Sequence, residues 1–182
     1  MTSDKLNRQL RKIKLIISDV DGVFTDGSLF IGSDGTEFKQ FHVLDGAGFA
    51  LLKAVDFPMA IISGRNSEVT TYRMRELGLD EHLYQGNLAK IEPYLTIKEK
   101  FKLTDEEIVY IGDDLVDIPL LRRVGVGIAV ANALPEVKQY AAYVTKASGG
   151  HGAIREAIEL ILKAQDKFNL AVERVTKVTY KD

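Results

Sequence analysis

Three short apolar runs in this chain are each followed at once by polar or charged residues. The runs are residues 15–18, 59–62 and 108–111, and they lead into Asp19, Ser63 and Asp113. Each run has the length of a buried strand, and segments with helical spacing of apolar residues separate them. Such alternation is typical of a parallel sheet covered by helices on both faces. The sequence therefore predicts an α/β fold built on a doubly wound, Rossmann-like parallel sheet.

The remaining elements of this fold can also be placed. Residues 28–41 are expected to form a β-hairpin inserted after the first strand, because two apolar stretches flank a turn that contains glycine. Helices are expected at residues 48–55, 67–77, 88–101, 118–124, 135–141 and 153–170, a helical turn after Thr104, and further strands at 126–129 and 143–145. Residues 171–182 are expected to be an extended arm or a frayed end.

The composition indicates a globular protein with one domain over residues 1–182. Hydrophobic residues make up 46% of the chain, charged residues 27%, and the net charge is −2, which argues against a nucleic-acid partner. The absence of cysteine excludes disulfides and thiol chemistry. No apolar run approaches the roughly 18 to 20 residues that span a bilayer. We therefore expect a cytoplasmic protein with no membrane partner.

The most informative motif is DVDGVFTDG, residues 19–27. Asp19 and Asp21 are two positions apart at the end of an expected strand, so both side chains project in the same direction. Open α/β sheets bind ligands at this edge. Two carboxylates held close together disfavour each other's ionisation unless a cation lies between them. The motif therefore indicates Mg²⁺, a phosphate group, or both.

The other strand ends add the remaining parts of a phosphoryl-transfer site. Asp19 is placed for a nucleophile and Asp21 for an acid and base, while Asp113 offers a third carboxylate for Mg²⁺. Ser63 supplies a hydroxyl group at the second strand end. The missing lysine is assigned to Lys90, although further lysines follow on the same segment. This convergence of groups predicts an active site at one edge of the sheet.

These motifs identify the chain as similar to phosphatases of the haloacid dehalogenase superfamily. Four motifs occur in the family's order, namely the D-x-D-G-x-x-T/V pattern in residues 19–27, an apolar strand ending in Ser63, then Lys90, and finally GDDLVD in residues 112–117. The hairpin, in place of a large cap domain, resembles the capless branch of the family. This finer resemblance covers residues 14–165 and implies a three-layer sandwich that assembles as a homotetramer through its hairpins.

The resemblance also implies a mechanism and site residues. Asp19 would form an aspartyl-phosphate and Asp21 would protonate the leaving group and then activate water. Mg²⁺ would be held by Asp19, the main-chain carbonyl of Asp21 and Asp113, with Ser63 and Lys90 on the phosphoryl oxygens. Asp114 and Asp117 would orient Lys90 or metal-bound water. Residues expected to face the substrate, besides Asp21 and Lys90, are His42, Val43, Leu44, Asp45 and Gly46, taken as a loop, and the cations Arg65 and Arg73.

The implied substrate is a small sugar-acid phosphate, 3-deoxy-D-manno-octulosonate 8-phosphate, an intermediate in lipopolysaccharide sugar biosynthesis. Two positions depart from the family pattern, because Leu44 and His151 stand where basic residues are expected. A sialic-acid-type 9-phosphate therefore remains a second candidate substrate. The sequence is also compatible with two functions of a different class. One is a phospho-receiver domain, which would carry its phosphorylated aspartate on a middle strand, and the second is an inactive protein of the same fold.

Overall fold

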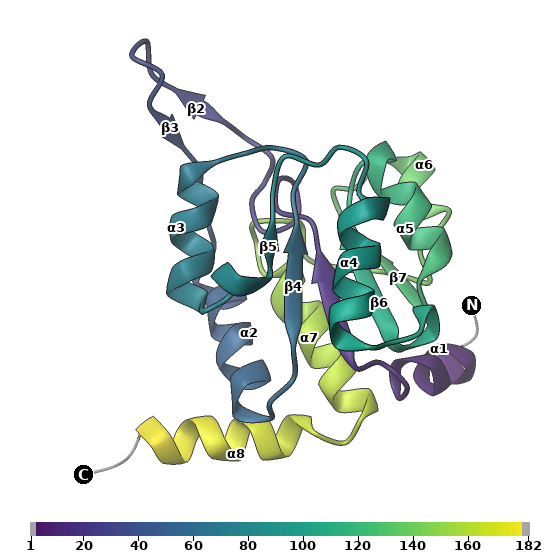
Figure 1. The fold of residues 1–182 in the computed structure, drawn as a ribbon. Coiled ribbons are helices and arrows are strands. Elements are labelled where there is room, and N and C mark those ends of the chain that lie inside the picture. Colours follow the sequence, from purple (N-terminus) through teal and green to yellow (C-terminus); the bar gives the residue numbers. More distant parts are fainter. Residues whose placement is uncertain (1–2, 180–182) are drawn as a thin grey trace.

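The centre of the molecule is a six-stranded parallel sheet with the strand order β5-β4-β1-β6-β7-β8 (Figure 1). The computed structural model describes residues 3–179. The strands of the sheet are β1 (Leu15–Ser18), β4 (Met59–Ile62), β5 (Leu83–Tyr84), β6 (Ile108–Gly112), β7 (Val126–Ala129) and β8 (Tyr143–Val144). From β1 the chain moves outward through β4 to β5, then crosses back and continues from β6 to β8. The predicted doubly wound parallel sheet is confirmed, with β5 as an additional short strand.

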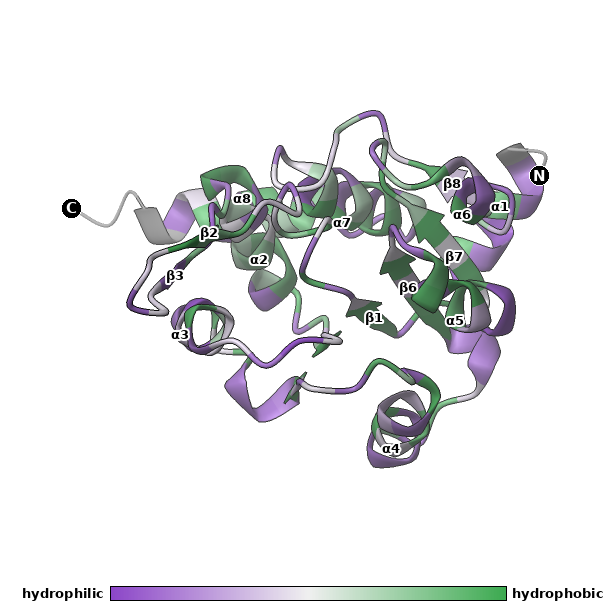
Figure 2. Ribbon diagram, turned by 90° about the horizontal axis from the view of Figure 1, so that it is seen from above, coloured by the Kyte–Doolittle hydropathy of each residue, from purple (hydrophilic) through white to green (hydrophobic). Residues whose placement is uncertain are grey.

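Helices cover the sheet on both faces, which gives the predicted three layers. They are α1 (Ser3–Leu10), α2 (Val43–Ala54), α3 (Glu68–Leu77), α4 (Ile91–Phe101), α5 (Ile118–Arg123), α6 (Pro135–Lys138), α7 (Ala153–Ala164) and α8 (Phe168–Thr179), with short 3₁₀ turns η1 (Asp80–His82), η2 (Asp105–Glu107) and η3 (Leu115–Asp117). Figure 2 shows α2 and α7 on one side of the apolar sheet and α4 and α5 on the other. The strands β1, β4, β6 and β7 are buried along their whole length, as their continuous apolar sequences require. Within residues 3–179 no helix combines the length and the apolar character needed to cross a lipid bilayer.

Several predicted helix boundaries rest on local chemistry that the structure confirms. The Ser67 hydroxyl accepts the amide hydrogen of Thr70 at the start of α3, and Gly78, with φ of 72°, ends that helix in the left-handed region. Pro93 falls in the first turn of α4, where its missing N–H costs no hydrogen bond. The turn after Thr104 is also present, and Glu107 accepts the Thr104 amide hydrogen.

The hairpin is present and projects beyond the carboxyl edge of the sheet (Figure 1). It consists of β2 (Phe30–Ile31) and β3 (Glu37–Phe38), paired antiparallel with Phe30 opposite Phe38. Gly35 has φ of 85°, a turn conformation that glycine adopts without steric cost. The exposed fractions of Phe30, Ile31 and Phe38 are 60%, 65% and 62%, so the hairpin presents apolar side chains to solvent.

The expected loop at residues 42–46 is wrong, because α2 begins at Val43 rather than near residue 48. His42 caps the helix, and its Nδ1 accepts the amide hydrogen of Leu44 at 3.2 Å. Gly46 and Gly48 have low helix propensity, which explains why the sequence suggested a loop here. One of them, Gly48, allows α2 to lie close to α7, since a β-carbon there would be 3.3 Å from the Cα of Arg155.

The C-terminal end of the chain also differs from expectation. The predicted helix 153–170 is broken at Asp166, whose φ is 57°, and the expected arm is instead α8, whose apolar face packs on α2 (Figure 1). Its apolar residues Phe168, Ala171 and Val172 recur at helical spacing, which explains the helix. Residues 180–182 lie outside the described part of the chain. The charged N-terminal segment forms α1, which buries Leu10.

Candidate active site

The three predicted strand ends meet at one edge of the sheet. Strands β4, β1 and β6 are adjacent and parallel, so the residues that follow them share the carboxyl edge. Carboxylate oxygens of Asp19, Asp113 and Asp117 all lie within 4.8 Å of one another. Three carboxylates this close require positive charge between or beside them. The structure provides one such charge directly, from Lys90.

Lys90 forms a buried clamp between two of these carboxylates. Its Nζ lies 2.6 Å from Oδ2 of Asp19 and 2.6 Å from Oδ1 of Asp117, and the exposed fraction of its side chain is 1%. Burial opposes the charge on the ammonium group, but the two carboxylates outweigh burial and raise the pKa of Lys90. Another lysine of the same segment, Lys98, instead pairs with Asp105. Of these two lysines, Lys90 is therefore the one that reaches the site.

Asp117 is fully buried and accepts four hydrogen bonds. Its Oδ1 accepts from Lys90 and, at 2.5 Å, from the Tyr110 hydroxyl, while Oδ2 accepts the amide hydrogens of Asp113 and Asp114. With both oxygens occupied, Asp117 holds Lys90 and the loop after β6 in place. Asp114 is exposed, and its carboxylate accepts the Leu115 amide hydrogen at the start of η3.

Asp113 has an unsatisfied carboxylate oxygen. Within residues 3–179, its buried Oδ1 has no hydrogen-bond partner. Burial, and then the carboxylates of Asp19 and Asp117, raise the pKa of Asp113 to about 8. Burial likewise raises the pKa of Asp19 to about 6, although Lys90 opposes this shift. A buried carboxylate oxygen without a partner, next to a second carboxylate, fits a divalent cation that prefers oxygen ligands.

Asp21 lies at the rim of this cluster and pairs with a lysine that the sequence did not suggest. Oδ1 of Asp21 is 2.6 Å from Nζ of Lys39, which follows β3 of the hairpin. The Lys39 side chain has an exposed fraction of 0%, whereas that of Asp21 is 22%. Glu37, two residues before Lys39, bonds to Arg65 at 3.3 Å. The hairpin therefore touches both the first and the second motif.

The second motif contributes the hydroxyl group of Ser63, which hydrogen-bonds to the main chain, and the partly exposed side chain of Arg65. The Ser63 amide hydrogen bonds to the Tyr84 carbonyl oxygen at 2.8 Å, which fixes the end of β4 against β5. The Ser63 hydroxyl group bonds to the main chain of Arg65. The Arg65 side chain has an exposed fraction of 46%, so its guanidinium group remains accessible beside Glu37.

The other residues expected near the substrate lie around the start of α2. Arg73 bonds to Glu76, stacks over the Phe41 ring at 5.9 Å, and lies where a side chain on Gly46 would be. Asp45 points inward and accepts amide hydrogens from the start of α7. Val43 and Leu44 are exposed. Substrate contacts of these residues stay predictions.

A glycine-rich loop completes the site from the C-terminal side. A β-carbon on Gly149 would lie 1.8 Å from the Gly22 carbonyl oxygen, so only glycine fits there. Asn132 joins the two loops, since its amide donates to the Gly22 carbonyl oxygen at 3.0 Å and accepts the Gly149 amide hydrogen at 2.6 Å. The neighbouring His151 is exposed, and its ring centroid lies 6.1 Å from that of His42. Sequence reasoning missed Asn132, because an isolated asparagine carries no motif.

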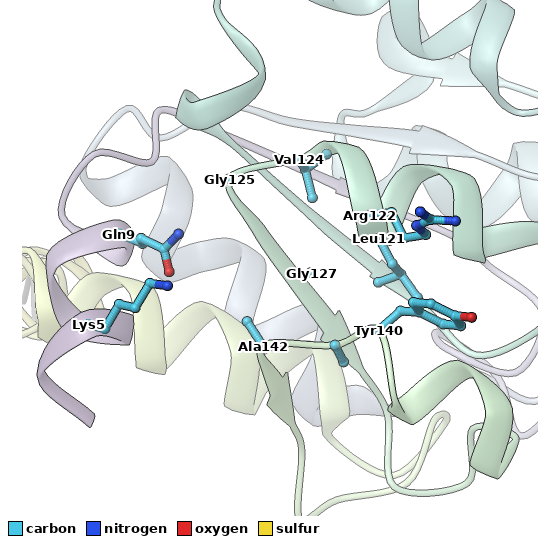
Figure 3. A pocket seen from close by; sticks show the side chains of 10 residues that line it. Lys5, Gln9, Leu121, Arg122, Val124, Gly125, Gly127, Tyr140 and Ala142 are labelled. Atoms are coloured by element: carbon cyan, nitrogen blue, oxygen red, sulfur yellow. The ribbon is translucent and has the colours of Figure 1, made fainter. Parts of the chain in front are cut away.

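A cleft lies away from this site, beside the amino end of β7. It has a volume of about 450 Å³, and Lys5 and Gln9 of α1 face Arg122 and Tyr140 across it (Figure 3). None of the predicted site residues lines this cleft. The predicted site residues therefore lie at the carboxyl edge of the sheet and not in this cleft.

Comparison with known proteins agrees with this fold. The family model described as haloacid dehalogenase-like hydrolase matches residues 59–158. A 3-deoxy-D-manno-octulosonate 8-phosphate phosphatase from Yersinia pestis is 42% identical over 165 residues, which cover 91% of this chain and 88% of the relative. A crystal structure of the Moraxella catarrhalis phosphatase of that name, in complex with magnesium, phosphate and the sugar KDO, has a TM-score of 0.90 and 38% identity, covering 94% of this chain and 98% of that one.

A hydrolase of the same superfamily from Legionella pneumophila is also similar, with a TM-score of 0.92 and 45% identity over 96% of this chain and 95% of that chain. The doubly wound α/β fold places a cluster of carboxylates at the carboxyl edge of the sheet, an arrangement suited to a phosphoryl-transfer enzyme. With these matches, the chain belongs to the haloacid dehalogenase-like hydrolases. This membership leaves no support for a phospho-receiver domain, whose phosphorylated aspartate follows a different strand.

Proposed function

We propose that this protein is a Mg²⁺-dependent phosphomonoester hydrolase that removes the phosphate group from 3-deoxy-D-manno-octulosonate 8-phosphate. The observation that carries the proposal is the arrangement of Asp19, Lys90 and Asp113. Among residues 3–179, a buried Asp113 carboxylate oxygen without a hydrogen-bond partner lies beside the lysine-bound carboxylate of Asp19. The relatives named for this reaction support the substrate. The whole of residues 1–182 would form one such phosphatase domain.

In this proposal Asp19 is the nucleophile. One of its carboxylate oxygens forms a bond to phosphorus while the bond between phosphorus and the sugar oxygen breaks. Asp21 donates a proton to the leaving alkoxide, then accepts a proton from the water that attacks the aspartyl-phosphate and releases inorganic phosphate. The partly exposed position of Asp21 at the rim suits contact with a leaving group that arrives from solvent.

The residues of this site fit a divalent cation. Asp19 and Asp113, with the main-chain carbonyl of Asp21, would hold Mg²⁺, since Asp117 has both oxygens occupied. When bound, Mg²⁺ supplies positive charge that offsets the charge of the phosphoryl oxygens. Lys90 and the Ser63 hydroxyl group would hold those oxygens as well. Asp117 positions Lys90, and Asp114 shapes the turn that follows.

The substrate's carboxylate would meet the cations around the rim. The accessible guanidinium of Arg65 can bind a carboxylate through two parallel hydrogen bonds, and Arg73 lies beside the start of α2. The neighbouring surface of residues 42–46 would face the sugar. Because Leu44 and His151 stand where basic residues are expected, a sialic-acid-type 9-phosphate stays the second candidate substrate. Turnover of both sugar phosphates, measured side by side, separates them, and a preference for the 9-phosphate would overturn the first choice.

We further propose that four copies assemble through their hairpins. The exposed apolar side chains of Phe30, Ile31 and Phe38 supply the surface that such an assembly would bury. The cytoplasmic location expected from the sequence stays a prediction.

Phosphate release tests the proposed reaction. Purified protein with Mg²⁺ should release inorganic phosphate from the sugar phosphate, and Asp19→Asn should abolish release. Substitution of the exposed Asp166 by Asn, in the turn between α7 and α8, serves as a control because asparagine tolerates the positive φ of that position, and it should preserve turnover. Release that persists in Asp19→Asn would overturn the proposed mechanism.

A further inference from the structure

Lys39 is a buried charge whose purpose the proposed reaction does not explain. Its side chain is completely enclosed, so it cannot contact a substrate, yet it belongs to the hairpin and not to the core. Burying an ammonium group is costly unless partners compensate for the lost hydration. The partners of Lys39 should therefore reveal what it does.

Three groups surround the Lys39 ammonium, and they come from three parts of the chain. Nζ lies 2.6 Å from Oδ1 of Asp21, 3.2 Å from the Thr70 hydroxyl oxygen and 3.5 Å from Oε1 of Glu37. Thr70 is fully buried in α3. Within residues 3–179, Lys39 is the side chain that hydrogen-bonds to the Asp21 carboxylate. Glu37 and Thr70 thus fix the lysine, and the lysine fixes Asp21.

The hydrogen bond from Lys39 fixes the orientation of the Asp21 carboxylate. A carboxylate on a surface turn rotates among several orientations, and each misplacement of an acid by about 1 Å can cost a hundredfold in rate. With Oδ1 held by Lys39, the orientation of Oδ2 is set as well. The Asp21 side chain is partly exposed, so a leaving group can reach it, and Oδ2 is the oxygen that Lys39 does not hold.

We propose that Lys39 is a positioning residue that orients the Asp21 carboxylate for proton transfer to the leaving group. The hairpin then has a second task beside assembly, since its stem supplies part of the active site's support. This inference rests on the proposed function, in which Asp21 is the acid and base.

The inference predicts a dependence on the leaving group. An alkyl phosphate such as a sugar phosphate needs protonation as its bond to phosphorus breaks, whereas p-nitrophenolate leaves without help. Because kcat/KM reports the step that forms the aspartyl-phosphate, Lys39→Met should lower kcat/KM for the sugar phosphate by roughly tenfold to hundredfold. The same variant should leave kcat/KM for p-nitrophenyl phosphate nearly unchanged. A merely structural role would lower both values together.

Two further variants sharpen the test. Lys39→Arg retains the charge and should recover part of the loss on the sugar phosphate. In an Asp21→Asn background, Lys39→Met should cause no further loss, because the residue it positions is already removed. Lys98→Met is the matched control, since Lys98 forms an equally short 2.6 Å pair with Asp105 away from the site, and it should leave both kcat/KM values unchanged.

The outcomes separate this inference from the proposed function. If wild-type protein releases no phosphate, or Asp19→Asn remains active, the proposed function fails. If wild-type protein is active but Lys39→Met lowers both kcat/KM values equally or neither, only the positioning role fails. If Lys39→Met does not fold, Thr70→Val provides a second test, because it retains the ion pair but removes one hydrogen-bond partner of Lys39. Thr70→Val should then lower kcat/KM by a smaller factor, and only for the sugar phosphate. An equal effect on both substrates would overturn the inference.

Discussion

The main chain of Gly22 packs directly against the carboxylate of Asp113. A β-carbon on Gly22 would lie 2.0 Å from Oδ2 of Asp113, and Gly22 has φ of 86°, a conformation that side chains rarely adopt. The turn after β1 can therefore approach the carboxylate after β6 only because residue 22 has no side chain. This contact closes the proposed cation site between the two strand ends.

Gly22→Ala should therefore remove activity and the stabilisation by Mg²⁺. The new methyl group must push Asp113 away, which adds to a backbone cost of about 1 kcal/mol for a left-handed residue. Gly35→Ala is a matched control, because Gly35 has φ of 85° and nothing within 4 Å of the added carbon. Thermal unfolding with and without Mg²⁺ checks this, and a normal Mg²⁺ response in Gly22→Ala would contradict it.

The metal-free protein should lose stability as the pH rises from about 4 to about 8. Burial raises the pKa of Asp113 from 3.8 to about 8 and that of Asp19 to about 6, so the folded protein retains protons that the unfolded chain releases. Since the unfolded chain then binds fewer protons, the free energy of unfolding falls across this window. A bound cation favours the ionised carboxylates, so Mg²⁺ should stabilise the fold more at pH 8 than at pH 6.

Unfolding temperatures at pH 4, 6 and 8, with Mg²⁺ or a chelator, measure both effects. Asp113→Asn should flatten the pH dependence above pH 6 and abolish the response to Mg²⁺. A metal-free protein whose unfolding temperature does not fall between pH 4 and 8 would contradict the prediction.

Asp117→Asn should damage both stability and activity. The substitution replaces a charge that Lys90 and Tyr110 both contact inside the protein, so it leaves a buried cation short of a partner, at a cost of about 3 kcal/mol. Because Lys90 then loses its anchor, activity should fall roughly tenfold to hundredfold. Asp114→Asn, in the same loop but exposed, should change stability by less than about 0.5 kcal/mol. Chemical denaturation and phosphate-release assays compare the pair, and similar behaviour of both variants would refute the anchoring role.

The hairpin's apolar side chains should hold the assembly together. Phe38→Ser combined with Phe30→Ser should lower the mass in solution, because these exposed rings would lose their mutual burial between subunits. Leu95→Ser, which removes an exposed side chain of α4, should leave the mass unchanged. Light scattering or sedimentation provides the mass, and a monomeric parent protein would contradict the proposed tetramer.

Sequence patterns predicted the parts of the molecule that are determined by residues close together in the sequence. The strand ends at Asp19, Ser63 and Asp113 were predictable, since a buried parallel strand has a continuous apolar sequence and its carboxyl end has a known location. The helix α8 was not, because its apolar face has meaning only against α2. The expected helix 153–170 was also wrong, because the chain leaves the helical conformation at Asp166, whose φ is positive.

Within the site, the residues that the sequence did not predict are those that support other site residues. Lys39 and Asn132 lie 18 and 110 residues from their partners Asp21 and Gly22, and no short motif contains them. Tyr110 reads as one more apolar residue of β6 until its hydroxyl group is seen on Asp117. Only the arrangement of the sheet edge in space brings such partners together.

Covalent trapping tests most directly whether Asp19 carries the phosphoryl group. Borohydride added during turnover of the sugar phosphate with Mg²⁺ reduces an aspartyl-phosphate to homoserine, which mass spectrometry of the peptide locates. We predict homoserine at position 19 in the wild-type protein, and none without substrate. Phosphate release with position 19 unmodified, or with homoserine at another aspartate, would contradict the assignment of Asp19 as the nucleophile.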